Sequence, residues 1–161
     1  MTGAVPQEYS RTQKSLHWAI AALVLAQYLA FDGIARAFGA GMREGGFEYS
    51  GVVVGHIVAG VLILGLTLWR LALRLTRGVP PAPAAEPGLA RVAAGAAHWG
   101  FYGLLIAMAA SGAVAWFGHV GPAAAAHMLG KTLLLALIGL HVAAVLAHQL
   151  WWRTGLIGRM T

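Results

Sequence analysis

The chain has 161 residues, of which 59% are hydrophobic and only 10% are charged, whereas roughly a quarter of the residues in a typical soluble domain are charged. This composition nearly excludes a water-soluble globule and favours one small helical membrane domain. The lack of cysteine excludes disulfides, iron–sulfur clusters, thiolate-ligated metals and c-type haem. The net charge of +6 is better explained by topology signals than by nucleic-acid binding, because the basic residues flank apolar runs.

Four apolar runs are each long enough to cross a bilayer, at residues 16–37, 52–75, 92–117 and 122–152. They are continuous rather than alternating, which argues against barrel strands. We therefore expect an all-α fold, an integral membrane four-helix bundle that forms a single domain over residues 1–161, with no cleaved signal peptide. Between the second and third runs, four prolines within residues 78–88 predict a stiff, extended strap.

Lysine and arginine placement predicts the orientation of the bundle. Basic residues gather in the N-terminal segment, in the second connection and at the C-terminus, while the third connection has none. Because cytoplasmic loops of membrane proteins are enriched in Lys and Arg, both termini should be cytoplasmic. The tryptophans, Trp116 among them, lie near span ends and are mostly interpreted as interfacial anchors.

Histidine is the most informative residue type in the sequence. Six of the seven histidines lie in or beside the apolar runs, namely His17, His56, His98, His127, His141 and His148. Ionisable groups inside a membrane are costly and usually functional. The last three of these are spaced by fourteen and seven residues, which places them within about 40° of one helical stripe. A single histidine could equally hydrogen-bond a neighbouring helix, but four at matched depths favour ligation.

The expected depths sort four histidines into two layers. If the helices alternate in direction, His56 and His127 share an outer layer, and His17 and His141 share an inner layer ~21 Å away along the last helix. Two facing imidazoles without thiolate or carboxylate suit six-coordinate haem iron. A tetrahedral zinc site would want more ligands at one depth, whereas mononuclear copper stays possible.

Small and basic residues lie close to these histidines. Gly60, Gly130 and Gly139 could let a flat porphyrin approach the backbone, or could serve ordinary helix packing. Lys131, one turn beyond an outer histidine, could meet a haem propionate or the substrate, or could snorkel to the interface. Arg70 is interpreted first as a topology residue and second as a propionate partner.

Five stretches are distinctive: residues 11–18 (RTQKSLHW), Gly55-His56 leading to Trp69-Arg70, residues 98–102 (HWGFY), residues 138–148 (IGLHVAAVLAH) and the closing residues 158–160 (GRM). Over nearly the whole chain and all four spans, the sequence resembles the bacterial cytochrome b561 family. The resemblance implies that His17, His56, His127 and His141 ligate the iron of two b haems. It also implies transmembrane electron transfer with ubiquinone, including oxidation of superoxide at the outer face, in the inner membrane of a bacterium.

The resemblance thus implies a multi-pass, quinone-linked oxidoreductase of the superoxide oxidase type. Electrons would pass from an outer-face donor or a redox partner protein through two haem b groups to ubiquinone. His98 and His148 should converge at the inner end and bind the quinone, since imidazole can relay its protons. Two alternatives stay open: a haem-b anchor for a peripheral dehydrogenase or hydrogenase, and a histidine-lined proton or metal transporter.

Overall fold

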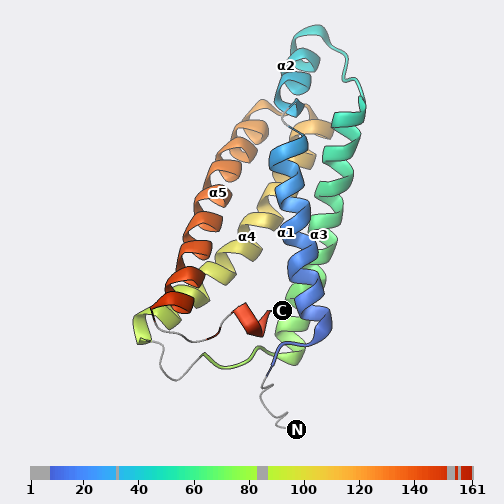
Figure 1. Ribbon diagram of the computed structural model, residues 1–161. Helices are drawn as coiled ribbons and strands as arrows, with labels where there is room; N and C mark the ends of the chain where they lie inside the picture. The colour runs from blue at the N-terminus through green and yellow to red at the C-terminus, as the bar shows by residue number, and fades with distance from the viewer. Residues whose placement is uncertain (1–7, 32, 83–86, 152–154, 156, 161) are drawn as a thin grey trace.

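The computed structural model describes residues 8–31, 33–82, 87–151, 155 and 157–160. Within these ranges the fold is helical and contains no strand, so the all-α prediction is confirmed. The elements are α1 (Arg11–Ala30), α2 (Ile34–Glu44), α3 (Gly51–Arg77), α4 (Gly88–Gly118), α5 (Gly121–Leu150) and a short 3-10 turn, η1 (Ile157–Arg159). Figure 1 shows α1, α3, α4 and α5 running along the long axis of the molecule, with α2 at one end.

Three helices, α3, α4 and α5, are long and apolar enough to cross a membrane by themselves. α1 and α2 meet the same criterion only as a pair bent by 60°, which would make a fourth span. The prediction of one continuous helix over residues 16–37 is therefore wrong. α1 ends at Ala30, and the amphipathic α2 begins at Ile34 and runs at an angle of 60° to α1.

Local capping explains where α1 and α3 begin and end. Ser10 caps α1, because its hydroxyl accepts a hydrogen bond from the Gln13 amide while the Gln13 side chain accepts one from the Ser10 amide at 3.0 Å. Ser50 caps α3 through the Val53 amide at 3.4 Å. Gly78 ends α3 with a φ of 74°, a value that glycine adopts without a steric penalty.

The proline-rich connection is extended where the structure describes it. Residues 78–82 and Pro87 are non-helical, as predicted, while residues 83–86 of the predicted strap lie outside the described residues. α4 begins at Gly88, four residues before the predicted start of that span, directly after Pro87. The predicted end of the last span, residue 152, also lies outside the described residues.

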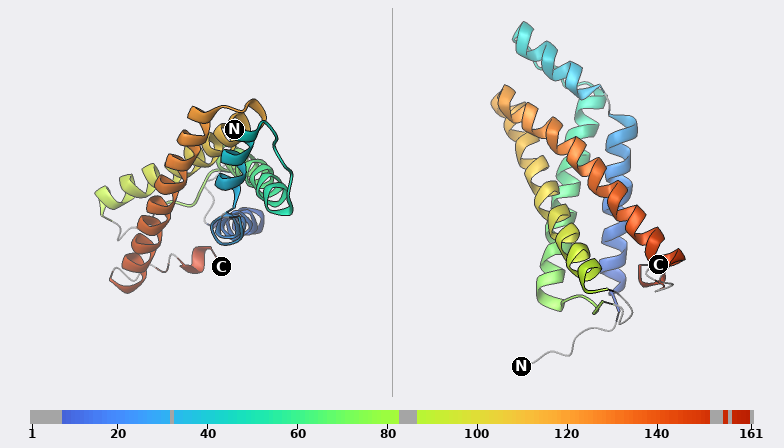
Figure 2. Two further views of the ribbon diagram at one scale, coloured as in Figure 1. Left: turned by 90° about the horizontal axis from the view of Figure 1, so that it is seen from above. Right: turned by 90° about the vertical axis from the view of Figure 1, so that its left-hand side faces the viewer.

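The helices pack unevenly around a small apolar core. α4 packs along α5, and α3 packs between α1 and α4, whereas neither α1 nor α3 packs closely along α5. Figure 2 shows this arrangement from above, with α5 set apart from α1 and α3. The core consists of Ile20, Val24, Ile63, Leu105 and Leu134. His56 of α3 and His17 of α1 each lie opposite a histidine of α5, across helix pairs that do not pack closely.

Gly130 explains the close packing of α4 and α5. A Cβ atom at Gly130 would lie 2.9 Å from Cγ of Met108, so a larger residue would push the two helices apart. Of the two sequence interpretations of Gly130, the structure thus supports helix packing. Gly60 instead lines a cavity, and a Cβ at Gly139 would meet no atom within 4 Å.

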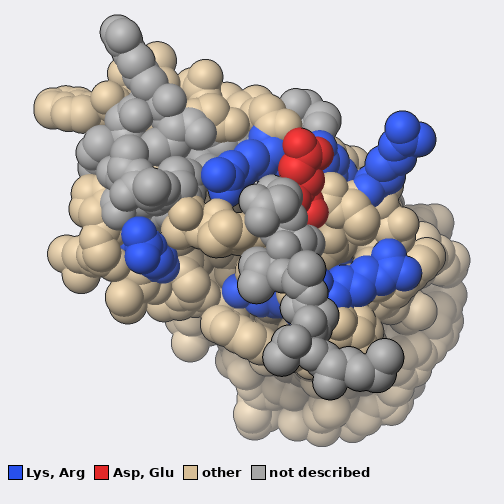
Figure 3. Space-filling view, turned by 90° about the horizontal axis from the view of Figure 1, so that it is seen from below, with Lys and Arg blue, Asp and Glu red and all other residues tan. Residues whose placement is uncertain are grey.

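The C-terminal segment contacts α1 and the connection after α3 at the end of the bundle opposite α2. The indole of Trp18 donates a hydrogen bond to the Met160 carbonyl at 2.8 Å, and Arg159 donates one to the Pro81 carbonyl at 2.8 Å. Viewed from this end, Lys and Arg side chains outnumber acidic ones (Figure 3). We call this end the basic end and the opposite end, where α2 lies, the α2 end.

Candidate functional site

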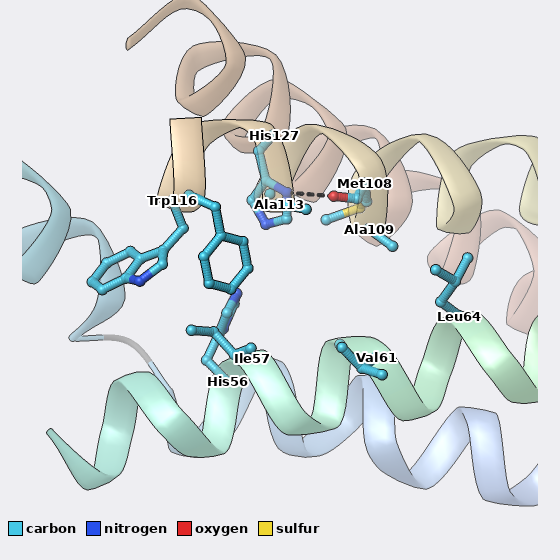
Figure 4. A pocket seen from close by; sticks show the side chains of 12 residues that line it. His56, Ile57, Val61, Leu64, Met108, Ala109, Ala113, Trp116 and His127 are labelled. Carbon is cyan, nitrogen blue, oxygen red and sulfur yellow. Dashed lines mark hydrogen bonds between the residues drawn. The ribbon is translucent and has the colours of Figure 1, made fainter. Parts of the chain in front are cut away.

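Two histidines face each other near the α2 end. His56 of α3 and His127 of α5 have ring centroids 6.0 Å apart and ring planes inclined by 66°. Both line a cavity of about 130 Å³, shown in Figure 4. Its other lining residues are apolar apart from Trp116, and they come from α3 and α4. The structure therefore brings together the outer pair that the sequence analysis predicted.

Hydrogen bonding orients the ring of His127. Its Nδ1 lies 2.9 Å from the carbonyl oxygen of Met108, and a carbonyl can only accept, so Nδ1 carries the proton. The lone pair of Nε2 is then available to a metal ion, the arrangement common among metal-ligating histidines. Gly112 makes room for this ring, because a Cβ there would lie 3.1 Å from its Cε1 and Nδ1 atoms.

His56 lacks such a partner among the described residues. Its Nδ1 is buried without a hydrogen bond, and so is Oε1 of Gln27, whose amide nitrogen donates to the His56 carbonyl at 3.0 Å. The edge of the Phe31 ring packs against the imidazole, with centroids 6.3 Å apart. Buried polar atoms in native proteins are nearly always satisfied, so unpaired atoms beside a cavity indicate a site that a bound group completes.

The second histidine group lies toward the basic end. His17 of α1 and His141 of α5 have ring centroids 6.5 Å apart, so the predicted inner pair is also brought together. His98 of α4 lies beside them, with its ring centroid 5.9 Å from that of His141. The sequence analysis placed His98 just past this pair, and its direct contact with His141 is a feature that spacing alone did not predict.

The second histidine assigned to the quinone lies farther along the same helix. His148 is buried, with 5% of its surface exposed, two turns beyond His141 on α5. His98 is oriented like His127, because its Nδ1 lies 2.7 Å from the Ala94 carbonyl and must donate to it. Its Nε2 is therefore available to accept a hydrogen bond or to bind a metal ion.

The spacing of both pairs fits axial ligation of one metal ion per pair. Two imidazoles that bind an ion from opposite sides at about 2 Å place their ring centroids roughly 6 Å apart, close to the observed 6.0 and 6.5 Å. Among the described residues, no group of three or more His, Cys, Asp or Glu side chains is arranged around a common metal position. Two opposed ligands and an apolar cavity suit haem iron better than tetrahedral zinc.

The two basic residues singled out from the sequence make contacts inside the bundle. The Arg70 guanidinium of α3 donates a hydrogen bond to the Gln13 carbonyl, one turn before His17. The Lys131 ammonium lies 5.7 Å from the ring centroid of Tyr28, whose hydroxyl donates to the Lys131 carbonyl at 2.6 Å. Their roles toward a haem propionate or a substrate stay predictions.

Sequence reasoning missed an aromatic cluster at the α2 end, made of Phe38, Phe47, Tyr49, Trp116 and His119. The His119 ring stacks on Phe47 with centroids 4.1 Å apart and planes inclined by 3°. Trp116 contacts Phe47, Phe38 and Tyr49 at centroid distances of 5.4, 6.4 and 5.9 Å. Trp116 is an exception among the tryptophans interpreted as interfacial anchors, since only 5% of its surface is exposed. The aromatic residues within positions 38–49 were the sequence feature that could have indicated this cluster.

Two comparisons with known proteins cover almost the entire chain. A family model described as prokaryotic cytochrome b561 matches residues 8–161, which include all five α-helices and all seven histidines. A protein named cytochrome b562, from Cereibacter sphaeroides, is 37% identical over 153 residues, which span 94% of each chain.

Proposed function

The chain belongs to the prokaryotic cytochrome b561 family of membrane electron-transfer proteins with haem b, and from this premise we propose that it carries electrons through two b haems between an outer-face donor and ubiquinone. His56 and His127 ligate the outer haem, and His17 and His141 ligate the inner one. The observation that carries the proposal is the repeated spacing of facing imidazoles, 6.0 and 6.5 Å between ring centroids, at two depths of one bundle.

Helix packing supports His17 rather than His98 as the partner of His141. His98 and His141 lie on α4 and α5, which pack along each other and leave little width for a porphyrin. His17 lies on α1, which does not pack closely along α5, just as α3 does not at the outer pair. A flat macrocycle between these helix pairs would fill both gaps, and His98 would then lie beside the inner haem.

We propose four membrane spans, with α1 and α2 counted as one bent span and the basic end in the cytoplasm of a bacterial inner membrane. The excess of Lys and Arg at the basic end supports this orientation. The polar face of α2 would meet the outer surface, while Phe38 of the same helix packs toward Trp116.

The protein residues define how electrons enter and leave. Haem iron would supply one-electron redox chemistry when bound, and ligation by two imidazoles would favour outer-sphere transfer over oxygen binding at iron. The apolar residues around His56 and His127 would give the outer haem surroundings of low polarity. The hydrogen bond from His127 to the Met108 carbonyl keeps the imidazole oriented and raises its basicity as a ligand.

Quinone reduction is proposed at the basic end, where His98 and His148 lie near His141. Ubiquinone needs protons as well as electrons, and imidazole can donate a hydrogen bond to a quinone oxygen and pass on a proton. At the outer face the donor is superoxide or a redox partner protein. A superoxide-generating system should reduce the outer haem if superoxide is the donor. Superoxide dismutase should then prevent this reduction.

Selective loss of one haem tests the ligand assignment. His56→Ala and His127→Ala should each deplete the outer haem, and His17→Ala and His141→Ala the inner one, as read from reduced-minus-oxidised spectra. His98→Ala is the matched control and should keep both haems. Loss of the inner haem in His98→Ala, with retention in His17→Ala, would refute the pairing.

The quinone assignment is tested in a double variant, His98→Ala with His148→Ala. Both haems should remain, while electron transfer to a soluble ubiquinone analogue should slow. Unchanged quinone reduction in a variant with both haems would rule these residues out. A colourless purified protein would instead favour a transporter, and copurification with a large peripheral enzyme would favour the anchor role.

A further inference from the structure

Trp116 is a buried hydrogen-bond donor that the proposed function does not use. Only 5% of its surface is exposed, and its Nε1 atom has no hydrogen-bond partner among the described residues. The indole nitrogen can only donate, and a buried N–H without an acceptor is unfavourable. The rings around it, Phe38, Phe47 and Tyr49, are apolar except for the Tyr49 hydroxyl.

The same side chain lines the cavity between the two outer histidines. Among the described side chains that line this cavity, only three have a polar nitrogen or oxygen: the imidazoles of His56 and His127 and the indole of Trp116. Figure 4 shows Trp116 at the end of the cavity near His56 and Ile57, away from Leu64. Among the described residues that line this cavity, Trp116 is therefore the one side chain, apart from the two proposed ligands, that can donate a hydrogen bond.

The position of Trp116 along α4 matches the edge of a haem held by those ligands. Gly112 lies against the His127 ring, and Trp116 follows one helical turn later, toward the α2 end. Haem b carries its two propionate carboxylates on one edge of the macrocycle. Charged groups avoid the hydrocarbon core, so the propionates of an outer haem would face the nearer surface, which is the α2 end.

We propose that Trp116 donates its indole N–H to a propionate of the outer haem and thereby positions that haem and sets its potential. This inference rests on the proposed ligation of an outer haem by His56 and His127. A hydrogen bond to a carboxylate is charge-assisted, and it disperses the negative charge near the iron. Its loss should favour the oxidised, more positive iron and lower the midpoint potential.

The test compares Trp116→Phe with the parent protein, both purified with haem. Phenylalanine keeps an aromatic ring but removes the donor. The expected results are retention of both haems, a propionate bending band at lower frequency in the resonance Raman spectrum, and a lower midpoint potential for the outer haem alone. Phe47→Leu is the control, since it disturbs the aromatic cluster and keeps the indole donor, and it should leave the Raman band unchanged.

Two outcomes would overturn the inference. In the first, Trp116→Phe holds both haems with an unchanged Raman band and potential, which would mean that the indole N–H faces only the ring of Phe47 or Tyr49. In the second, Phe47→Leu shifts the band as much as Trp116→Phe does, which would assign the effect to packing.

If Trp116→Phe loses the outer haem, the next variant to measure is Trp116→His, because histidine retains a ring N–H donor. Recovery of the haem in Trp116→His supports the hydrogen bond, and continued loss refutes it. Absence of a second haem from the parent protein is a different result, because it would refute the proposed function itself.

Discussion

Gly112→Ala tests whether the backbone of α4 is shaped around the ring of His127. The added Cβ would lie 3.1 Å from two atoms of that ring, closer than ordinary van der Waals contact. A hydrogen bond opposes movement of the ring away from Gly112, because the His127 Nδ1 lies 2.9 Å from the carbonyl oxygen of Met108, which is on α4 like Gly112. Overpacking of this kind costs about 1–3 kcal/mol. A haem-free chain can relieve it by rotating the imidazole, but a ligated imidazole cannot.

The expected consequence is that Gly112→Ala retains the outer haem roughly 5- to 150-fold more weakly. Haem content per chain and reduced-minus-oxidised spectra of the purified protein measure this directly. Gly103→Ala is the matched control on α4, since a Cβ there meets nothing within 4 Å, and it should keep both haems. Equal haem content and equal spectra in the two variants would refute the proposed fit between Gly112 and His127.

Three further predictions concern stability and topology. Gln13→Leu should lower the free energy of unfolding by about 1–3 kcal/mol, because the Gly78 carbonyl loses the hydrogen bond that the Gln13 side-chain nitrogen donates at 3.1 Å. An unchanged thermal midpoint in detergent would argue against this. Tyr28→Phe should cost about 1 kcal/mol through loss of the 2.6 Å bond to Lys131, and equal stability would contradict it. An alkaline phosphatase fused at the C-terminus should be inactive and one fused between α4 and α5 active; the opposite pattern would reverse the orientation.

The three later spans and the histidine pairs were predictable because they depend on local regularities. Continuous apolar runs specify α3, α4 and α5, and their limits differ from the predicted ones by only a few residues where the structure describes them. The depth of a side chain in a helix follows from a rise of ~1.5 Å per residue. That arithmetic was enough to bring His56 together with His127, and His17 together with His141.

The features that could not be predicted depend on how helices rotate and fold back. The contact of His98 with His141 depends on which face of α4 meets α5, which spacing along one helix does not define. The break between α1 and α2 falls inside a mostly apolar run, and α2 then packs Phe38 toward Trp116. The burial of Trp116 follows from that contact, so a sequence pattern typical of an interfacial anchor was misleading here.

The number of haems per chain is the most direct test of the two-layer arrangement. A pyridine haemochrome assay on the purified protein, combined with amino-acid analysis, measures it without assumptions about the donor or the quinone. We predict two b haems per polypeptide, both low-spin because each iron would have two imidazole ligands. One haem per polypeptide, or none, would contradict it.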